Sequence, residues 1–180
     1  SIGRRHLRNF CDLAREMNIE ICVDALRTRK GYSRNATPAL PAVREYENIA
    51  DIDEHYDIAF ITNPTYLHFQ TLKDILSRVD HIYIEKPLFE SSQRHFREIP
   101  WKEGHIYHIA CPLRRDPGVQ HLKRIKARPL SARIICSSYL PDWRPGTDYT
   151  VGYSAWNTQG GGVWRDLIHE WDYVRFVWGD

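Results

Sequence analysis

Apolar positions recur at two different spacings along the first half of the chain. Residues 4–17 and 66–78 carry them three or four positions apart, which predicts two amphipathic helices. Residues 19–26 alternate apolar and polar side chains, and residues 56–62 and 81–85 are short apolar runs, so three strands are predicted. Because helices and strands alternate, the pattern predicts a parallel α/β sheet, whose ligands lie outside the carboxyl ends of its strands.

The last third of the chain has a different pattern. Strands are predicted at 106–111 and 130–140, helices at 117–127 and 163–178, and an aromatic loop rich in proline and glycine at 141–149. The change of pattern places a domain boundary near residues 104–111. It divides the chain into units of residues 1–105 and 106–180.

Composition excludes several classes of protein. Lys and Arg number 25 against 23 Asp and Glu, so the net charge of +2 offers no basic surface for nucleic acid. No apolar run approaches the ~20 residues that a membrane helix needs, and no signal peptide is visible. None of the 4 cysteines forms a C-x-x-C pair, which argues against zinc and favours reduced thiols. We therefore expect a globular protein of the cytoplasm.

Two positions of the first unit suit a dinucleotide. Gly3 stands directly before the first helix, where backbone amides can meet a pyrophosphate. Arg27 stands at the end of the second predicted element, where an acidic residue holds the ribose of NAD and an arginine suits the 2′-phosphate of NADP. Asp24 competes for this position, and Arg27 with Arg29 and Lys30 also fits a solvated basic turn. The arginine favours NADP over NAD.

The tripeptide Glu85-Lys86-Pro87 is the most specific short motif of the chain. It ends a predicted strand, and the proline restricts the backbone of the residue before it. Lys86 is therefore expected to be extended at the ligand-binding edge of the sheet, where its ammonium can bond a substrate hydroxyl. A surface ion pair in a turn is the alternative.

A second candidate segment runs from three glycines at 160–162 into the last predicted helix. Asp166 and His169 stand three positions apart, so they share a helix face, and Asp166 can orient His169 for proton transfer. The glycines let the backbone approach a ligand closely. A structural histidine and a first-turn acid favoured by the helix dipole are the alternative. One histidine with carboxylates on one helix is a weak metal signature, so no metal site is expected.

Together these segments resemble the glucose–fructose oxidoreductase/inositol dehydrogenase (Gfo/Idh/MocA) family. The matching segments stand in family order at residues 1–9, 62–68, 85–87, 111–114 and 160–173. The resemblance implies a Rossmann domain at 1–105 that lacks its first strand. It also implies that residues 106–180 begin an α/β domain for substrate binding and dimerisation, with a mostly antiparallel sheet. The start at Ser1 instead of Met agrees with a fragment of a longer enzyme.

The resemblance also implies an activity, the NAD(P)-dependent hydride transfer to or from a sugar, a polyol or a sugar derivative. Lys86, Asp166 and His169 are then the catalytic residues. The spacing of Asp166 and His169 is one residue shorter than in many members, which leaves the proton donor open. The expected cofactor contacts are Ile2, Gly3, Arg27, Asn63, Pro64, His68, Glu85 and Lys86.

Substrate contacts are expected from both units. They are Lys86, Arg114, Trp143, Arg144, Tyr153, Asp166 and His169. The loop at 140–160 is expected to cover the substrate, although its aromatic side chains equally suit an oligomer interface. The parent enzyme is expected to be a homo-oligomer with no nucleic acid or membrane partner. A non-catalytic dinucleotide or sugar sensor and an inactive fragment are the alternatives; the presence of Lys86 with His169 argues for an enzyme.

Overall fold

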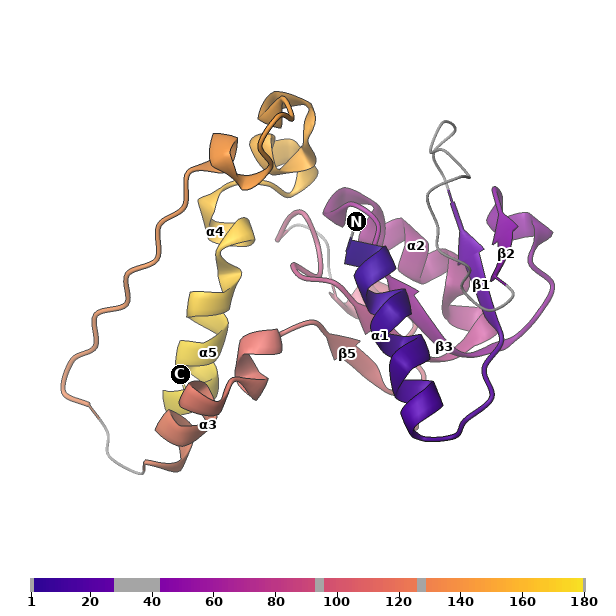
Figure 1. The fold of residues 1–180 in the computed structure, drawn as a ribbon, viewed down its shortest axis with the longest axis horizontal. Helices are drawn as coiled ribbons and strands as arrows, with labels where there is room; N and C mark the ends of the chain where they lie inside the picture. Colours follow the sequence, from indigo (N-terminus) through magenta and orange to yellow (C-terminus); the bar gives the residue numbers. More distant parts are fainter. Residues whose placement is uncertain (1, 28–42, 93–95, 126–128, 180) are drawn as a thin grey trace.

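The computed structural model describes residues 2–27, 43–92, 96–125 and 129–179 (Figure 1). Its first part consists of α1 (Ile2–Glu16), β1 (Val23–Leu26), β2 (Val43–Tyr46), β3 (Tyr56–Ile61), α2 (His68–Ile75), β4 (Val79–Ile84) and β5 (Tyr107–Ile109). β1 pairs with β2, and a second sheet has the order β3-β4-β5. All these strand pairs are parallel, so the predicted parallel α/β fold is confirmed.

The second sheet sends alternate side chains to two covered faces, as the pleat of a strand requires. Ile61 and Ile84 are buried with Leu72 of α2 in the main apolar core. On the opposite face, the Phe60 ring lies 5.2 Å from the Phe10 ring of α1. α1 and α2 therefore cover opposite faces of the sheet.

The second part of the chain is mainly helical. It contains η6 (Pro112–Arg115), α3 (Pro117–Arg124), α4 (Val163–Asp166) and α5 (Ile168–Trp178), with short 3₁₀ turns over residues 140–159. α3 packs beside α5 (Figure 1), and the Lys123 ammonium donates to the carbonyl oxygen of Phe176 across that contact. In the described ranges, no helix is long and apolar enough to span a bilayer.

Residues 129–139 run extended and exposed, without a partner strand among the described residues. The strand predicted at 130–140 is therefore wrong. Its β-branched side chains carry strand propensity, but a strand also needs a neighbouring backbone that bonds its N–H and C=O groups. The apolar pattern records only the first of these requirements.

Two other segments differ from their sequence pattern. The helix predicted at 163–178 is interrupted at Leu167, between α4 and α5. Residues 111–114, which resemble the strand that opens the family's second domain, instead enter a 3₁₀ turn at Pro112, because proline supplies no N–H to a strand ladder.

The first sheet region extends as far as β5, which pairs with β4. Its last residue, Ile109, falls inside the predicted boundary at 104–111. No strand follows Ile109 in the part of the chain that the structure describes, so the mostly antiparallel sheet of the second unit stays a prediction.

Candidate active site

Lys86 connects the two parts of the molecule at the carboxyl edge of the sheet. It stands two residues after the end of β4, and its peptide bond to Pro87 is cis. Its Nζ donates a hydrogen bond to the main-chain carbonyl oxygen of Asp166 over 2.9 Å, although the two residues stand 80 positions apart. The structure thus brings the strand-edge lysine against the helical segment that carries His169.

The interruption at Leu167 explains why this carbonyl is available. In a continuous helix, the carbonyl of Asp166 would accept the N–H of the residue four positions later. α4 ends at Asp166 and α5 begins at Ile168, with Leu167 at φ −100° and ψ 34°. The helical ladder is broken at this point, and Lys86 uses the carbonyl that the break leaves free.

His169 is half-buried in the first turn of α5. Burial lowers its pKa, and the positive charge of Lys86 lowers it further. Its imidazole is therefore neutral near neutral pH and can accept a proton. This state suits a general base in the oxidation of a hydroxyl group.

The Asp166 carboxyl is half-buried beside the same lysine. Burial raises its pKa, while the charges of Lys86 and Arg144 and a hydrogen bond from the Ser154 hydroxyl oppose the rise. Ser154 Oγ donates to Oδ1 over 3.3 Å. Sequence reasoning missed Ser154, since nothing in its local pattern distinguishes it from any other loop serine.

Glu85 is held in place by α1. His6 Nε2 lies 2.5 Å from Glu85 Oε1, and the backbone N–H of Lys86 donates to Oε2 over 3.3 Å. Sequence reasoning also missed His6. A signal was present, because His6 stands four positions before Phe10 and so faces the sheet with it.

The start of α1 packs tightly against the loop after β3. A Cβ atom on Gly3 would lie 2.7 Å from the Thr62 hydroxyl, closer than such contacts come. Glycine therefore lets this helix begin at the carboxyl edge, as the dinucleotide prediction requires. In the same loop, the Asn63 side chain donates to Thr71 Oγ1 over 2.8 Å, and Pro64 is half-buried.

The predicted cofactor contact of His68 stays a prediction. The residue is 1% exposed and therefore buried in this structure. Its ring nitrogens face three backbone carbonyls, from the loops after β3 and β4. The sequence motif located His68 in the right loop, but burial is a property of the packed structure.

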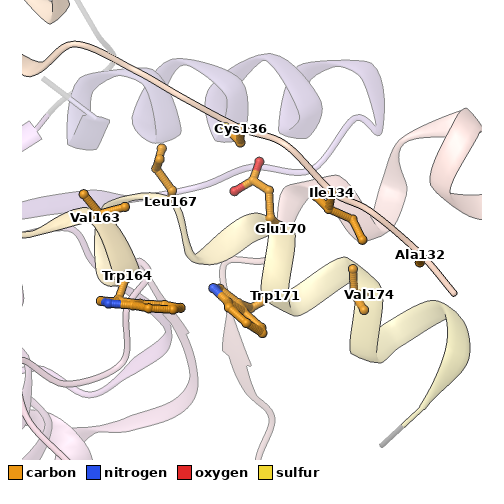
Figure 2. A pocket seen from close by; sticks show the side chains of 9 residues that line it. All are labelled: Ala132, Ile134, Cys136, Val163, Trp164, Leu167, Glu170, Trp171 and Val174. Carbon is orange, nitrogen blue, oxygen red and sulfur yellow. The ribbon is translucent and has the colours of Figure 1, made fainter.

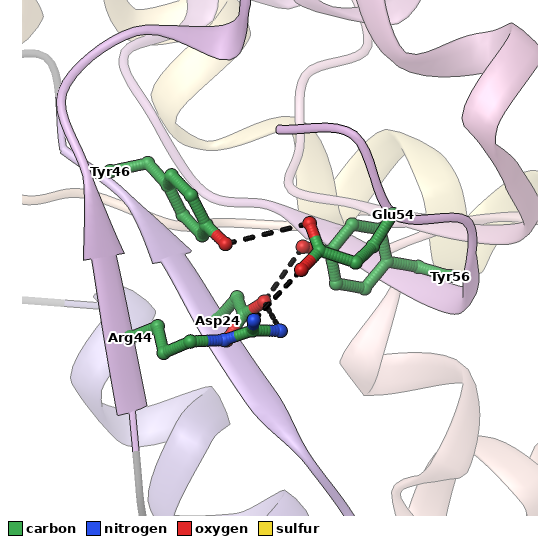
Figure 3. Close-up of polar contacts among 5 residues, drawn as sticks. All are labelled: Asp24, Arg44, Tyr46, Glu54 and Tyr56. Atoms are coloured by element: carbon green, nitrogen blue, oxygen red, sulfur yellow. Dashed lines mark hydrogen bonds and ion pairs between the residues drawn. The ribbon is translucent and has the colours of Figure 1, made fainter. Parts of the chain in front are cut away.

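Arg27 directly follows β1, and its guanidinium forms an ion pair with Glu45 at 2.7 Å. Its basic neighbours Arg29 and Lys30 lie outside the described residues. Asp24, the competing candidate, accepts two hydrogen bonds from Arg44 and one from Tyr56 (Figure 3). These partners hold the Asp24 carboxylate inside the fold, which leaves Arg27 as the candidate at this strand end.

The predicted substrate residues fall into two groups. The charge of Arg144 lowers the pKa of Asp166. Tyr153 is half-buried, and burial raises the pKa of its hydroxyl, an effect that the charge of Asp166 increases. Arg114 forms an ion pair with Asp172, from Nε to Oδ2 over 2.9 Å, and stacks on Phe176. The Trp143 indole donates to the Ser138 hydroxyl of the extended segment that precedes its loop. Arg144 and Tyr153 therefore join the candidate site, whereas Arg114 and Trp143 are engaged with other partners.

The glycines at 160–162 let the second part of the chain approach the carboxyl edge of the sheet closely. Gly160 has φ +87°, and a Cβ atom there would lie 2.9 Å from the Thr65 side chain. A Cβ atom on Gly161 would lie 2.3 Å from the carbonyl oxygen of Ser154. The close approach that these glycines allow is thus between protein segments.

A groove of about 390 Å³ lies along α4 and α5 (Figure 2). It is lined by Ala132, Ile134, Cys136, Val163, Trp164, Leu167, Glu170, Trp171 and Val174. None of the candidate catalytic residues lines it, so it is separate from the site around Lys86. No cluster able to hold a metal ion exists among the described residues.

Comparisons with known proteins relate the chain to one family and to one relative. A family model for GFO_IDH_MocA, an oxidoreductase family with an NAD-binding Rossmann fold, matches residues 1–100. The uncharacterized oxidoreductase YrbE of Bacillus subtilis strain 168 is 25% identical over 189 residues, which cover 99% of this chain and 51% of that protein. The chain thus spans about half the length of this relative. No solved structure matches.

Proposed function

Because this chain belongs to the Gfo/Idh/MocA family of oxidoreductases with an NAD-binding Rossmann fold, we propose that it acts as an NAD(P)-dependent dehydrogenase of a sugar, a polyol or a sugar derivative. The contact from Lys86 to Asp166 is the observation that carries the proposal. It joins the lysine of the sheet edge to the helical segment with His169. A substrate bound between the two parts would therefore touch both.

The carboxyl edge of the sheet suits a dinucleotide. Ile2 and Gly3 open a helix of 15 residues whose first N–H groups have no helical partner and can bind a phosphate. Asn63, Pro64 and Glu85 follow β3 and β4 at this edge. When bound, the nicotinamide supplies or accepts the hydride.

The protein's own residues would handle the proton and the orientation of the substrate. In the oxidation direction, the neutral His169 would accept the hydroxyl proton at a ring nitrogen. Lys86 would donate a hydrogen bond to the same oxygen, sharing or replacing its contact to the Asp166 carbonyl. Tyr153 and Arg144, beside Asp166, would bind further polar groups of the substrate.

The remaining parts of the proposal concern the whole protein. We assign dinucleotide binding to residues 1–105 and substrate and subunit contacts to residues 106–180. The active protein would be a homo-oligomer of the cytoplasm that acts on a small molecule.

Turnover of reduced or oxidised nicotinamide cofactor, followed by absorbance, tests the proposal with the full-length protein. The panel contains polyols, aldoses, sugar acids and sugar nucleotides. We expect turnover with one of these classes and a decrease of ~10²–10⁴-fold in kcat for Lys86→Ala, the scale of an acid–base group. The matched control is Lys102→Ala, at an exposed lysine outside the site.

A second measurement separates an enzyme from a sensor. Fluorescence titration with reduced cofactor measures binding without any substrate. Binding without turnover on any of the panel would favour a sensor, and the absence of binding would overturn the assignment of a dinucleotide site.

A further inference from the structure

His68 occupies a position between the two loops that carry the candidate site. It is the first residue of α2, and its side chain is 1% exposed. Its Nδ1 lies 3.1 Å from the carbonyl oxygen of Pro87 and 3.2 Å from that of Leu88, while Nε2 lies 3.0 Å from the carbonyl oxygen of Asn63. One ring thus spans the loop after β3 and the loop after β4.

The neighbouring contacts place the Lys86 loop between α1 and this ring. On one side of Lys86, Glu85 is held by His6 of α1. On the other side, Pro87 and Leu88 present their carbonyl oxygens to His68. Lys86 therefore lies between Glu85, which contacts α1, and the Pro87–Leu88 carbonyls, which contact α2. From this position its Nζ donates to the Asp166 carbonyl.

The carbonyls around the ring limit where its hydrogen can donate. Burial lowers the pKa of His68, against the opposing effect of the backbone carbonyls, so the ring is neutral near neutral pH and carries one N–H. Two carbonyl oxygens face Nδ1 and one faces Nε2. Carbonyl oxygens only accept, so a neutral ring donates on one side and turns a lone pair toward a carbonyl on the other. A hydrogen on Nδ1 would donate to the two carbonyls of the Lys86 loop, whereas a hydrogen on Nε2 would donate to Asn63 alone.

We propose that His68 is a positioning residue, which donates from Nδ1 to the Pro87 and Leu88 carbonyls and thereby holds Lys86 in reach of Asp166. Its catalytic consequence rests on the proposed function, because it acts through Lys86. The geometric part of the proposal needs neither cofactor nor substrate. If His68 only filled space, the position of its ring hydrogen would not affect Lys86. Asn and Gln at this position would then have the same effect on Lys86.

Two substitutions separate the ring nitrogens. The amide nitrogen of His68→Asn can take the place of Nδ1, and that of His68→Gln the place of Nε2. The readout is trace acetylation of lysine amines across a range of pH, with the extent at Lys86 measured by mass spectrometry in the full-length protein. Lys102, an exposed lysine, serves as the reference in each sample.

We expect His68→Asn to label at Lys86 like the unaltered protein. His68→Gln is expected to label about fivefold faster, the effect of losing one hydrogen bond. Lys102 is expected to label equally in all variants, and His121→Asn, at an exposed histidine of α3, to change nothing. Equal labelling of the Asn and Gln variants, at either rate, would overturn the proposal.

A measurement on the unaltered protein does not depend on how the variants fold. Long-range ¹H–¹⁵N NMR of the His68 ring reports which nitrogen carries the hydrogen. Hydrogen on Nδ1 supports the proposal, and hydrogen on Nε2 overturns it. These readouts need no turnover. If the cofactor assays contradicted the proposed dehydrogenase function, the labelling and NMR results would still test the role of His68.

Discussion

Single residues owe their chemistry at this site to burial combined with nearby charges, of which Lys86 acts on both Asp166 and His169. Asp166 and His169 are both half-buried, and burial shifts their pKa values toward the neutral form of each group. Lys86 opposes the shift of the carboxyl and reinforces that of the imidazole, because its charge is positive. The lysine therefore keeps His169 available as a proton acceptor.

Removing this charge should raise the pKa of His169. Lys86→Met keeps the length of the side chain and removes its ammonium, so burial still lowers the pKa of His169 while nearby carboxylates, chiefly Glu170 and Asp172, raise it. We expect the imidazole titration, followed by NMR, to move upward toward the ordinary histidine value of 6.5. An unchanged titration would show that Lys86 and His169 do not face one another. Lys102→Met is the control.

Arg27 provides a test of cofactor choice. Its guanidinium is bonded to Glu45 and can bind a 2′-phosphate only by sharing or leaving that carboxylate. We expect NADP to be preferred over NAD, and Arg27→Ala to lower kcat/KM for NADP by about tenfold or more, with little change for NAD. Glu45→Gln should strengthen NADP binding by freeing the arginine. A preference for NAD that Arg27→Ala leaves unaltered would contradict this assignment.

Among the secondary-structure elements, the two parallel sheets are joined by side chains at one end. Arg44 of β2 donates to Asp24 of β1 and to Glu54, which precedes β3 (Figure 3). Tyr56, the first residue of β3, donates to Asp24 over 2.8 Å. Since β1 pairs with β2 and β3 with β4, this network links the two sheets through Asp24.

The Asp24 carboxylate should contribute stability that acid removes. Burial alone would raise its pKa, but the hydrogen bonds from Arg44 and Tyr56 outweigh burial and lower it below the ordinary 3.8. A lowered folded-state pKa stabilises the protein above the unfolded value and loses that contribution as pH falls through the folded value. Asp24→Asn should therefore be less stable at neutral pH and lose less stability on acidification below about pH 4.

Urea unfolding at neutral and acidic pH checks this prediction. Asp57→Asn, at an exposed carboxylate of β3, is the control and should unfold like the unaltered protein. Equal acid sensitivity of the unaltered protein and Asp24→Asn would show that the network does not hold the two sheets together.

On the scale of the whole molecule, the site depends on contact between two parts that fold around different elements. Lys86 stands on the edge of a sheet, and His169 stands on a helix that packs with α3. Gly160 against Thr65 and Lys86 against Asp166 are two of the contacts between these parts. The proposed chemistry needs both contacts at once.

Lys86→Ala and His169→Ala should therefore have non-additive effects on turnover. Each is expected to lower kcat by ~10²–10⁴-fold. The double variant should be little worse than either single one, because both groups act on one proton transfer. Cofactor binding, measured by fluorescence titration, should survive in all three. Multiplied effects in the double variant would mean that the two residues act in separate steps.

The amino-acid sequence by itself determined the features that depend on neighbours along the chain. The spacing of apolar residues identified α1, α2 and the strands β1, β3 and β4, since those periods follow from backbone geometry. It did not identify β2. Short motifs located Lys86 at a strand end and His169 after a glycine run. The family could be recognised because these motifs keep their order along the chain.

Only the tertiary structure decided which of these residues meet, and in what state. His6 reaches Glu85 across 79 positions, and Lys86 reaches a carbonyl that becomes available only where the last helix breaks. The burial of His68 and the unpaired course of residues 129–139 likewise follow from what the rest of the chain places beside them. A local pattern records propensity, whereas burial, hydrogen-bond partners and pKa depend on groups distant in sequence.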